Sequence, residues 1–273
     1  METEKLLVCN NFEITRINGR KEKKIVSGFS AKLFPGTLTA LCGKNGSGKT
    51  TLIKALGGIN LSELKIKNDG YFYGDKNLNL LPARDYSKTF STLFQNEENA
   101  WNFSVYDYIL TGRFPHTNFS GFYSQKDKAL TEQIISELRL SDLANEKIFN
   151  VSGGEFQKAR IARALVQEPK ILLLDEPDGN LDINVQSEFF KLLLKTISEK
   201  QICCLASLHD LNQAALYSHQ IILISKIDDK ETQVFFTGTP EEIINKQNID
   251  LVYGTDCEIF IHPIHHKPQV SLK

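Results

Sequence analysis

A glycine-rich stretch with a lysine and two threonines carries the clearest chemistry in this sequence. It reads G-K-N-G-S-G-K-T-T and follows the pattern G-x-x-x-x-G-K-[ST] of loops that bind nucleotide phosphates. Glycines let the backbone approach a phosphate closely, and the N–H groups at the start of a following helix attract the anion. The residues that we expect to bind ATP are Gly43, Lys44, Asn45, Gly46, Ser47, Gly48, Lys49, Thr50 and Thr51.

Two of these residues have individual roles in the expected site. Lys49 would bring its positive charge to the β- and γ-phosphates, and Thr50 would offer its hydroxyl to Mg²⁺. Residues 37–42 are apolar and partly β-branched, as expected of a buried strand, and residues 51–56 suit a helix that ends at Gly57. This strand, loop and helix order argues against a chance glycine-rich turn.

Two adjacent carboxylates, Asp175 and Glu176, follow the continuous apolar run of residues 171–174. A run without alternation is typical of a parallel strand buried on both faces, and ligands bind at the carboxyl ends of such strands. We expect Asp175 to hold Mg²⁺ through water and Glu176 to orient or polarise the water that attacks a phosphate. The alternative, two solvated acids at a strand end, is disfavoured beside a phosphate loop.

Composition describes an ordinary globular chain. Its 273 residues allow one large domain or one domain with an inserted subdomain. The net charge of −1 gives no electrostatic footprint for nucleic acid, so we expect no nucleic-acid partner. The first residues carry charge of both signs without an apolar run, so we expect no signal peptide. Apolar runs such as residues 171–174 are too short to cross a bilayer.

The cysteine and histidine patterns favour no structural metal or disulfide. The five cysteines are odd in number and include no C-x-x-C, which indicates a reducing cytosol. We interpret Cys203 and Cys204, which lie in an apolar run, as inert strand residues. His262, His265 and His266 could form a metal-binding tail, but no second group of ligand-type residues accompanies them, so we disfavour this interpretation.

The remaining pattern predicts the elements that would position the chemistry. A strand-rich lead-in covers residues 5–35, with a tight turn at Asn18-Gly19 and a solvated charged turn at residues 21–24. Helical periodicity in residues 97–165 predicts a mostly helical insertion. Asp182 would cap a helix over residues 185–197. Further strands are expected at residues 89–94, 202–208, 221–224 and 234–236.

Residues 151–158, V-S-G-G-E-F-Q-K, resemble the signature motif L-S-G-G-x-x-Q of ATP-binding-cassette (ABC) ATPases. Ser152 and the backbone at a helix start would form an anion-binding surface. The resemblance implies that this surface covers the γ-phosphate bound to a second copy, in a head-to-tail dimer with two ATP molecules at its interface. The residues implied to bind ATP in trans are Ser152, Gly153, Gly154, Glu155 and Asp182.

Three more positions match switch residues of this family. Gln95 matches the residue that touches Mg²⁺ and reports the nucleotide state to the membrane partner. Asn180-Leu181-Asp182 matches the loop that crosses the dimer, and His209 matches the histidine that contacts the γ-phosphate. The combined interpretation makes Glu176 and His209 catalytic. The expected Mg²⁺ ligands are Thr50, Gln95 and Asp175.

The resemblance covers nearly the whole chain and implies an α/β fold. Its parts would be a RecA-like phosphate-loop core with a mixed or parallel sheet, an N-terminal antiparallel β subdomain and an inserted helical subdomain. The implied ATP-binding core comprises residues 1–95 and 166–273, and the helical subdomain, which carries the signature motif, comprises residues 96–165.

Two stretches resemble the ATPases of importers for iron-siderophore complexes, haem or cobalamin. They are T-G-R-F-P-H at residues 111–116 and L-H-D-L-N-Q-A-A at residues 208–215. The implied function is Mg-ATP hydrolysis that drives uptake. Two copies would lie peripherally on the cytoplasmic side of the inner membrane, below transmembrane permease subunits that an external substrate-binding protein supplies.

Some features depart from the family or leave other functions open. No aromatic residue lies in the region Ile17 to Arg20, where the family usually has one that stacks on adenine. A soluble ABC ATPase acting in translation or DNA maintenance would usually carry two fused cassettes or a coiled-coil insertion. A small-molecule kinase would have no use for residues 152–155. This chain has one set of motifs and no heptads.

A dense group of aromatic residues follows Gln95. Its members are Trp101, Phe103, Tyr106, Tyr108, Phe114, Phe119, Phe122 and Tyr123. We expect some to pack in the core and the rest to line an exposed apolar groove, a feature that marks docking sites. In the family such a groove receives a short helix of the permease, and Trp101 would be its anchor.

Overall fold

The computed structural model describes residues 5–19, 21–59, 61–95, 102–117, 121–179, 181–227 and 232–273. Its centre is a mixed sheet in the order β11–β10–β3–β9–β8–β7, parallel from β10 to β7 and antiparallel between β11 and β10. The strands are β3 (Leu38–Gly43), β7 (Phe90–Leu93), β8 (Ile171–Asp175), β9 (Cys203–Ser207), β10 (Gln220–Ile227) and β11 (Thr232–Gly238). The α/β fold is therefore confirmed.

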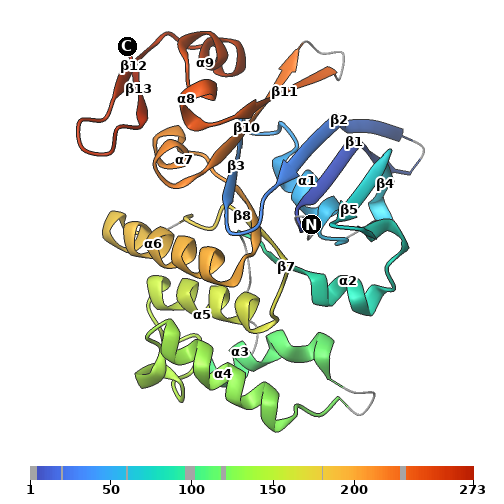
Figure 1. The fold of residues 1–273 in the computed structure, drawn as a ribbon, viewed down its shortest axis with the longest axis vertical. Helices are drawn as coiled ribbons and strands as arrows, with labels where there is room; N and C mark the ends of the chain where they lie inside the picture. Colours follow the sequence, from blue (N-terminus) through green and yellow to red (C-terminus); the bar gives the residue numbers. More distant parts are fainter. Residues whose placement is uncertain are drawn as a thin grey trace.

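Both faces of the central sheet are covered, which explains the unbroken apolar runs. Every residue of β3, β8 and β9 is buried. Leu172 and Leu174 of β8 belong to one apolar core, whereas Ile171 and Leu173 belong to another on the opposite face. Figure 1 shows the helices of the first core on one side of the sheet and α1 with the N-terminal sheet on the other. These helices are α1 (Lys49–Leu56), α5 (Gly153–Val166), α6 (Ile183–Lys200) and α7 (Leu211–Tyr217).

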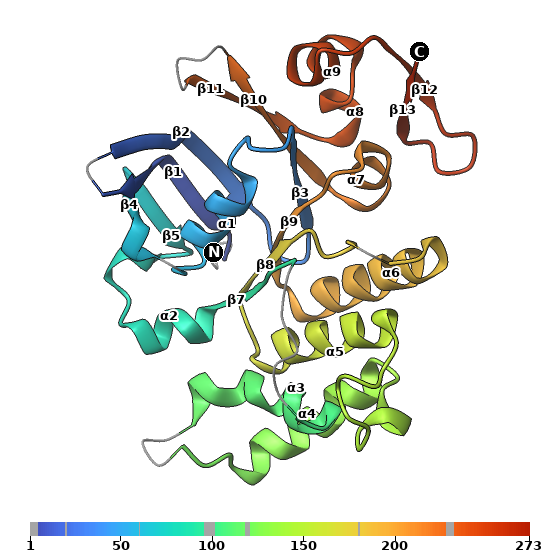
Figure 2. The ribbon, with the colours of Figure 1, turned by 180° about the vertical axis from the view of Figure 1, so that it is seen from behind.

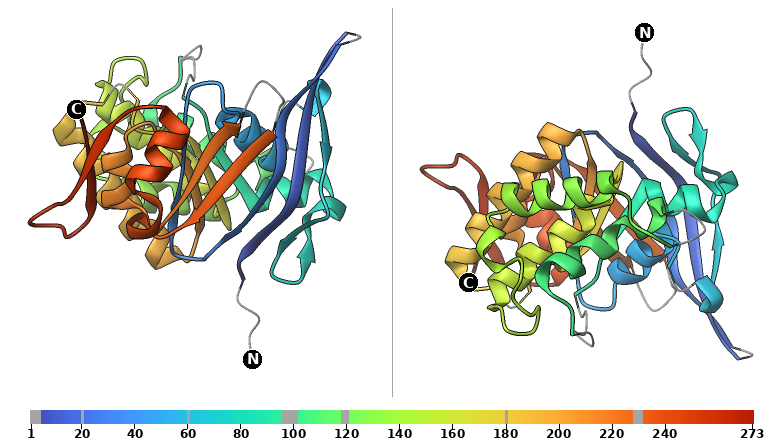
Figure 3. Two further views of the ribbon diagram at one scale, coloured as in Figure 1. Left: turned by 90° about the horizontal axis from the view of Figure 1, so that it is seen from above. Right: turned by 90° about the horizontal axis from the view of Figure 1, so that it is seen from below.

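The N-terminal part of the chain forms an antiparallel sheet, as predicted. Its strands are β1 (Leu7–Asn18), β2 (Lys21–Leu33), β4 (Leu64–Lys67), β5 (Gly70–Tyr73) and β6 (Lys76–Asn77). The prediction of a charged turn at residues 21–24 was wrong, because β2 begins at Lys21 and Lys24 pairs with Thr15 of β1. These residues lie toward the outer end of the arm formed by β1 and β2, where residues 21–23 are exposed, so a strand can carry the charge. Figure 3 shows this arm extending beyond the rest of the molecule.

Short elements lead from this sheet to a helical region. They are η1 (Leu61–Glu63), η2 (Leu78–Leu80) and α2 (Ala83–Thr89), and α2 runs directly into β7 (Figure 2). The helical region contains α3 (Val105–Leu110), η3 (Thr111–His116), α4 (Gln125–Glu137) and η4 (Ser141–Leu143), packed against α5. The predicted helical character is confirmed where the chain is described. The division into a core and an inserted subdomain stays a prediction.

Within the described part, the aromatic residues of this region divide into buried and exposed ones, whereas the groove that the exposed ones were expected to line stays a prediction. Tyr108 is buried, and Phe103 and Tyr106 pack against the same core. Phe114 and Phe122 are 68% and 81% exposed. Trp101 and Phe119 lie outside the described residues, so the structure does not test the anchor assigned to Trp101.

The T-G-R-F-P-H stretch joins three elements of the helical region. A Cβ at Gly112 would lie 2.1 Å from the Arg163 carbonyl oxygen, so only glycine fits between η3 and α5. The buried guanidinium of Arg113 donates to Asp127 at 2.7 Å and to Glu168 and the Val166 carbonyl at 2.8 Å each. A buried ion pair of this kind is costly to break, because removing one partner leaves an uncompensated charge.

We expect Asp127→Asn to destabilise the protein in a pH-dependent way. Burial raises the pKa of Asp127, but hydrogen bonds from Ser124 and Arg113 outweigh burial and lower this pKa from 3.8 to about 2. The carboxylate therefore contributes about 2 kcal/mol of stability that is present above pH ~4 and is lost as the pH falls toward ~2. Urea unfolding should show a difference between parent and variant that shrinks over this interval. A pH-independent difference, or one matched by the exposed control Asp142→Asn, would contradict this assignment.

The C-terminal segment packs beside α7 and β10. It consists of α8 (Pro240–Ile243), α9 (Lys246–Tyr253) and a hairpin of β12 (Cys257–Ile261) and β13 (Pro268–Leu272). The Asn212 side chain of α7 donates to the Val270 carbonyl at 3.2 Å and accepts from the Val270 N–H at 2.7 Å. Among the described residues, no helix combines the length and apolar character needed to cross a membrane.

All five cysteines are free and buried. Burial raises the pKa of Cys42 and of Cys203 to about 12. Burial also raises the pKa of the Cys204 thiol well above its ordinary value. Cys203 and Cys204 are buried residues of β9, as predicted, and a raised pKa favours the protonated thiol, which is the less reactive form.

Candidate functional site

The phosphate-loop residues form a tight turn between the end of β3 and the start of α1. Gly43 and Gly48 have φ angles of 150° and 105°, in the region that side chains disfavour. A Cβ at Gly43 would lie 2.7 Å from the Ile224 carbonyl oxygen, and one at Gly48 would lie 3.1 Å from that of Ile25. Gly46 has open space around it. Two glycines are thus required by the packing, and the third leaves room for a ligand.

Lys49 and Ser47 are positioned for an anion. Lys49 is buried, and its Nζ donates to the carbonyl oxygens of Gly43 at 2.7 Å and Lys44 at 3.2 Å. Burial lowers the pKa of Lys49, while Cys42, Glu176 and Asp175 oppose this shift. The Ser47 hydroxyl is buried and has no hydrogen-bond partner among the described residues. A phosphate oxygen would complete its bonding, so this loop fits the nucleotide that the sequence predicts.

Two of the expected metal-binding side chains, Thr50 and Asp175, meet although they lie far apart in sequence. Thr50 donates from its hydroxyl to Asp175 Oδ1 at 3.2 Å. Gln95 follows β7, and its Nε2 lies 3.6 Å from the position of a Cβ built on Gly179, in the turn after Glu176. A hydroxyl, a carboxylate and an amide oxygen are the hard donors that Mg²⁺ prefers, so Thr50, Asp175 and Gln95 fit the ion.

Glu176 and His209 meet at the ends of neighbouring strands. His209 Nε2 lies in hydrogen-bonding contact with Glu176 Oε1 across the ends of β8 and β9. Glu176 has a φ angle of 50°, the left-handed region that costs a non-glycine residue about 1 kcal/mol or more. Such strain concentrates at functional sites and must be held in place by neighbouring contacts. The two residues that we expect to be catalytic are therefore in direct contact.

Ser152 is the N-cap residue of α5, which agrees with the helix start that the signature motif implies. Its hydroxyl accepts from the Glu155 N–H at 3.3 Å, and the Glu155 carboxylate accepts from the Ser152 N–H at 2.8 Å. Hydrogen bonds from Ser152 lower the pKa of Glu155. Gly153 has open space around it, whereas a Cβ at Gly154 would lie 2.7 Å from Val185 of α6. Glu155 thus completes a capping box, and its carboxylate is held against the N-terminus of α5.

Asp182 lies at the N-cap position of α6, as predicted, but its side chain makes no capping hydrogen bond. The predicted position of Asp182 was therefore right, but the predicted hydrogen bond from its side chain to the helix was wrong. The neighbouring Asn180 lies outside the described residues. An Asp182 side chain that is not used as a cap is compatible with the contact in trans that the family resemblance implies.

Sequence reasoning assigned no role to four residues that hold the site together. The Ser207 hydroxyl bonds to Asp175 and to the Glu176 N–H. Gln233 of β11 donates from Nε2 to the Ser47 carbonyl at 2.7 Å and to the Ile25 carbonyl at 2.8 Å. Arg160 of α5 bonds to the Phe94 carbonyl, next to Gln95, and to Gln157, which itself bonds to the Pro177 carbonyl. Only Gln157 had a signal in the sequence, as the final residue of the signature motif.

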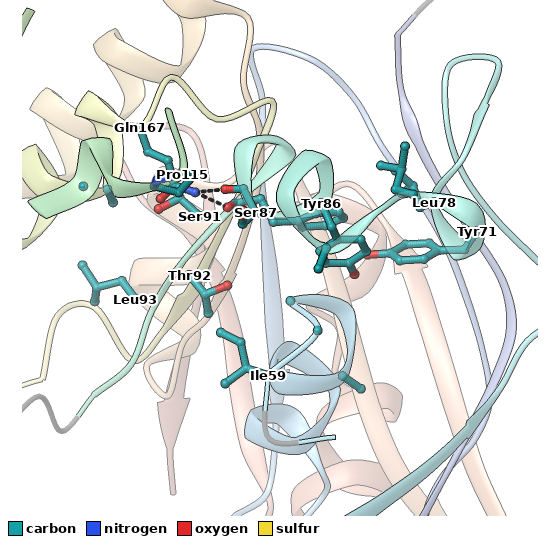
Figure 4. Close-up of a pocket in the computed structure, with 18 of the residues that line it drawn as sticks. Ile59, Tyr71, Leu78, Tyr86, Ser87, Ser91, Thr92, Leu93, Pro115 and Gln167 are labelled. Atoms are coloured by element: carbon teal, nitrogen blue, oxygen red, sulfur yellow. Dashed lines mark hydrogen bonds between the residues drawn. The ribbon is translucent and has the colours of Figure 1, made fainter. Parts of the chain in front are cut away.

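A cavity of about 790 Å³ lies away from the phosphate loop. It is bounded by the N-terminal sheet, the end of α1, α2, β7 and the helical region, and Figure 4 shows its lining residues. Tyr71 and Tyr86 both donate to the Leu56 carbonyl at one side of the cavity, and Gln167 at the other side donates to Ser87 and Phe90 carbonyls. Leu93 of β7 lines it two residues before Gln95. The cavity therefore borders the strand that leads to a candidate metal ligand.

A comparison with known protein families matches the part of the chain that carries most of these motifs. Residues 26–179, from the N-terminal sheet to the turn after Glu176, match the family described as ABC transporter. The chain belongs to the ABC transporter family. As an ABC ATPase it hydrolyses ATP and couples hydrolysis to transport. The family generally uses Mg-ATP.

Several relatives extend over almost the full length of this ABC ATPase. Hemin import ATP-binding protein HmuV from Escherichia coli is 34% identical over 88% of this chain and 90% of its own length. Iron(3+)-hydroxamate import ATP-binding protein FhuC from Bacillus subtilis is 30% identical over 92% of this chain and 90% of its own length. An inward-facing metal-chelate type ABC transporter has the same fold, with a TM-score of 0.77 at 23% identity over 99% of this chain and 98% of the other.

Proposed function

We propose that this ABC ATPase powers the import of an iron-siderophore complex, haem or cobalamin. The observation that carries its motor role is the convergence of Thr50, Asp175, Glu176 and His209 at the carboxyl ends of adjacent strands. The cargo class is supported by the T-G-R-F-P-H stretch and by relatives named for hemin and iron(3+)-hydroxamate import. Among the residues that the structure describes, no feature favours a soluble function in translation or DNA maintenance.

In this proposal the phosphate loop binds ATP and the strand ends hydrolyse it. Lys49 releases its bonds to loop carbonyls and meets the β- and γ-phosphates, while loop N–H groups and the start of α1 hold the anion. Glu176 accepts the proton of the attacking water, and His209 orients Glu176 and contacts the γ-phosphate. Thr50, Asp175 and Gln95 would hold Mg²⁺, which would supply positive charge against the charge that develops on the phosphates.

The site is completed by a second copy of the chain. Ser152, Gly153 and the N-terminus of α5 present an anion-binding surface, with Gly154 packed on α6 and Glu155 locked in the capping box. In our proposal this surface and Asp182 cover ATP held by the partner copy. Residues 1–95 and 166–273 would act as the ATP-binding core, and residues 96–165 as a helical unit that carries the signature motif between copies.

The cavity between these parts is the proposed seat of a permease helix. It borders β7 near Gln95, so a change at the γ-phosphate would reach the occupant through a few residues. Apolar and aromatic side chains around a groove suit an amphipathic helix. The chain would then lie peripherally on the cytoplasmic side of the membrane, below transmembrane subunits supplied by an external binding protein.

We expect Ala83→Arg to uncouple ATP hydrolysis from uptake. Ala83 is exposed at the start of α2 and lines the cavity, so a large charged side chain would obstruct the helix without disturbing the core. The matched control is Leu80→Arg, because Leu80 is 78% exposed nearby and does not line the cavity. Uptake of ferric siderophore, haem or cobalamin would be measured in vesicles that hold the permease, with ATP on the side of this chain.

The proposal predicts that Ala83→Arg loses at least ~90% of uptake while its basal ATPase activity stays within about twofold, since a rim contact affects docking and not chemistry. Leu80→Arg should transport normally. Equal transport by the two variants would place the permease contact elsewhere. If the parent complex takes up none of the three ligand classes when ATP is supplied, the proposed cargo is contradicted.

A further inference from the structure

Ser207 is a buried polar residue inside the site. It ends β9, and its side chain has no exposed surface. In the sheet it pairs with Leu41 of β3 on one side and Asp175 of β8 on the other. It therefore lies between the strand that enters the phosphate loop and the strand that carries both acids. Buried hydroxyls need partners, and those of Ser207 are all in the site.

One hydroxyl group connects the two acidic residues. Ser207 Oγ donates to Asp175 Oδ1 at 2.7 Å and accepts from the Glu176 backbone N–H at 2.9 Å. A serine hydroxyl has one hydrogen and two lone pairs, so it can serve both partners at once. Thr50 also donates to Oδ1 of Asp175, at 3.2 Å. The two donors converge on a single carboxylate oxygen and fix the direction in which the carboxylate faces.

The second bond acts on a strained turn. Glu176 has a φ angle of 50°, so its backbone needs neighbouring contacts to stay in the left-handed region. The bond from its N–H to Ser207 is such a contact, and it comes from a strand separate from β8. The Glu176 side chain then reaches His209, which follows Ser207 by two residues. Both the peptide and the carboxylate of Glu176 are thus held by the end of β9.

We propose that Ser207 is a positioning residue that aims Asp175 at the metal ion and Glu176 at the attacking water. The inference rests on the proposed roles of these two acids. Removing the hydroxyl would leave the Asp175 carboxylate with one donor fewer and free the peptide that turns Glu176 toward His209. Residues that orient metal ligands typically change metal affinity or activity by about 10- to 100-fold when they are replaced.

The test compares Ser207→Ala with Ser207→Thr, which retains a hydroxyl. The matched control is Ser225→Ala, which removes a buried hydroxyl from β10 of the same sheet, outside the acid pair. Ser207→Ala should lower kcat by about 10- to 100-fold with the KM for ATP within about twofold. The Mg²⁺ concentration needed for half-maximal binding of a fluorescent ATP analogue should rise by about tenfold, while binding without Mg²⁺ is unchanged.

Rescue by Ser207→Thr, with Ser225→Ala behaving as the parent, would complete the expected result. The inference is overturned if Ser207→Ala retains parental kcat and Mg²⁺ dependence. It is equally overturned if Ser207→Ala and Ser225→Ala lose the same activity together with the same melting temperature, because the role is then structural. A parent protein that binds the analogue but shows no Mg²⁺-dependent hydrolysis would instead contradict the proposed function, and this outcome is distinct from failure of Ser207.

Discussion

Replacing Glu176 by glutamine should lower the rate of ATP hydrolysis by about 10²–10⁴-fold, the usual loss when a positioned base is removed. The amide keeps the shape of the side chain but cannot accept the proton of the attacking water. Glu176 is the acid that contacts His209 at the end of β8, so no change in loop geometry is expected. Phosphate release in single-turnover conditions measures the chemical step directly.

ATP binding is the internal control for this substitution. The Glu176→Gln protein should bind a fluorescent ATP analogue with an affinity within a few-fold of the parent. The exposed acid Glu188 on α6 supplies a matched variant, Glu188→Gln, which should hydrolyse ATP normally. Hydrolysis by Glu176→Gln at the parental rate would remove Glu176 from the catalytic role, whatever its binding affinity.

Lys49→Ala should weaken ATP binding by about 100-fold, because the phosphates lose a charge-assisted donor held within the loop. The Lys49 ammonium is already held at the Gly43 and Lys44 carbonyls. The side chain is therefore close to its binding position before a phosphate arrives and loses little conformational freedom on binding. Equilibrium titration with an ATP analogue gives the change in dissociation constant. Hydrolysis at saturating ATP would fall as well, since the same charge meets the γ-phosphate.

A second lysine on the same helix separates charge from packing. Lys54 lies on α1 with its ammonium over the Phe94 ring, away from the start of the helix. Lys54→Ala should leave ATP affinity within about threefold of the parent. Parental affinity in Lys49→Ala, or equal losses in the two variants, would argue that the phosphate loop does not bind ATP through this lysine.

Local patterns in the sequence were enough to predict most of the site. Residues 43–51 form one continuous motif whose residue types predict phosphate binding. The structure places this motif between a buried strand and a helix. The apolar run before Asp175 predicted a strand buried on both faces, which is confirmed. Parallel strands end at one edge of a sheet, which is consistent with the contact between Glu176 and His209 at the ends of two predicted strands.

Contacts between distant segments could not be predicted. Ser207 has no motif of its own, and its role depends on the register that pairs it with Asp175. Gln233 supports the phosphate loop from a strand nearly two hundred residues away. The charged residues 21–24 had the composition of a turn, but their pairing with β1 makes them a strand. In each case tertiary pairing decides the outcome, and local residue preference does not.

The central claim is that ATP is bound between two copies of this chain, and the mass of the Glu176→Gln protein tests it most directly. Light scattering after gel filtration should give the 30.9 kDa chain mass without nucleotide and twice that mass with Mg-ATP. The dimer should contain two ATP molecules, and Ser152→Arg added to the same chain should abolish it. A monomer that carries bound ATP at saturating nucleotide would contradict the account.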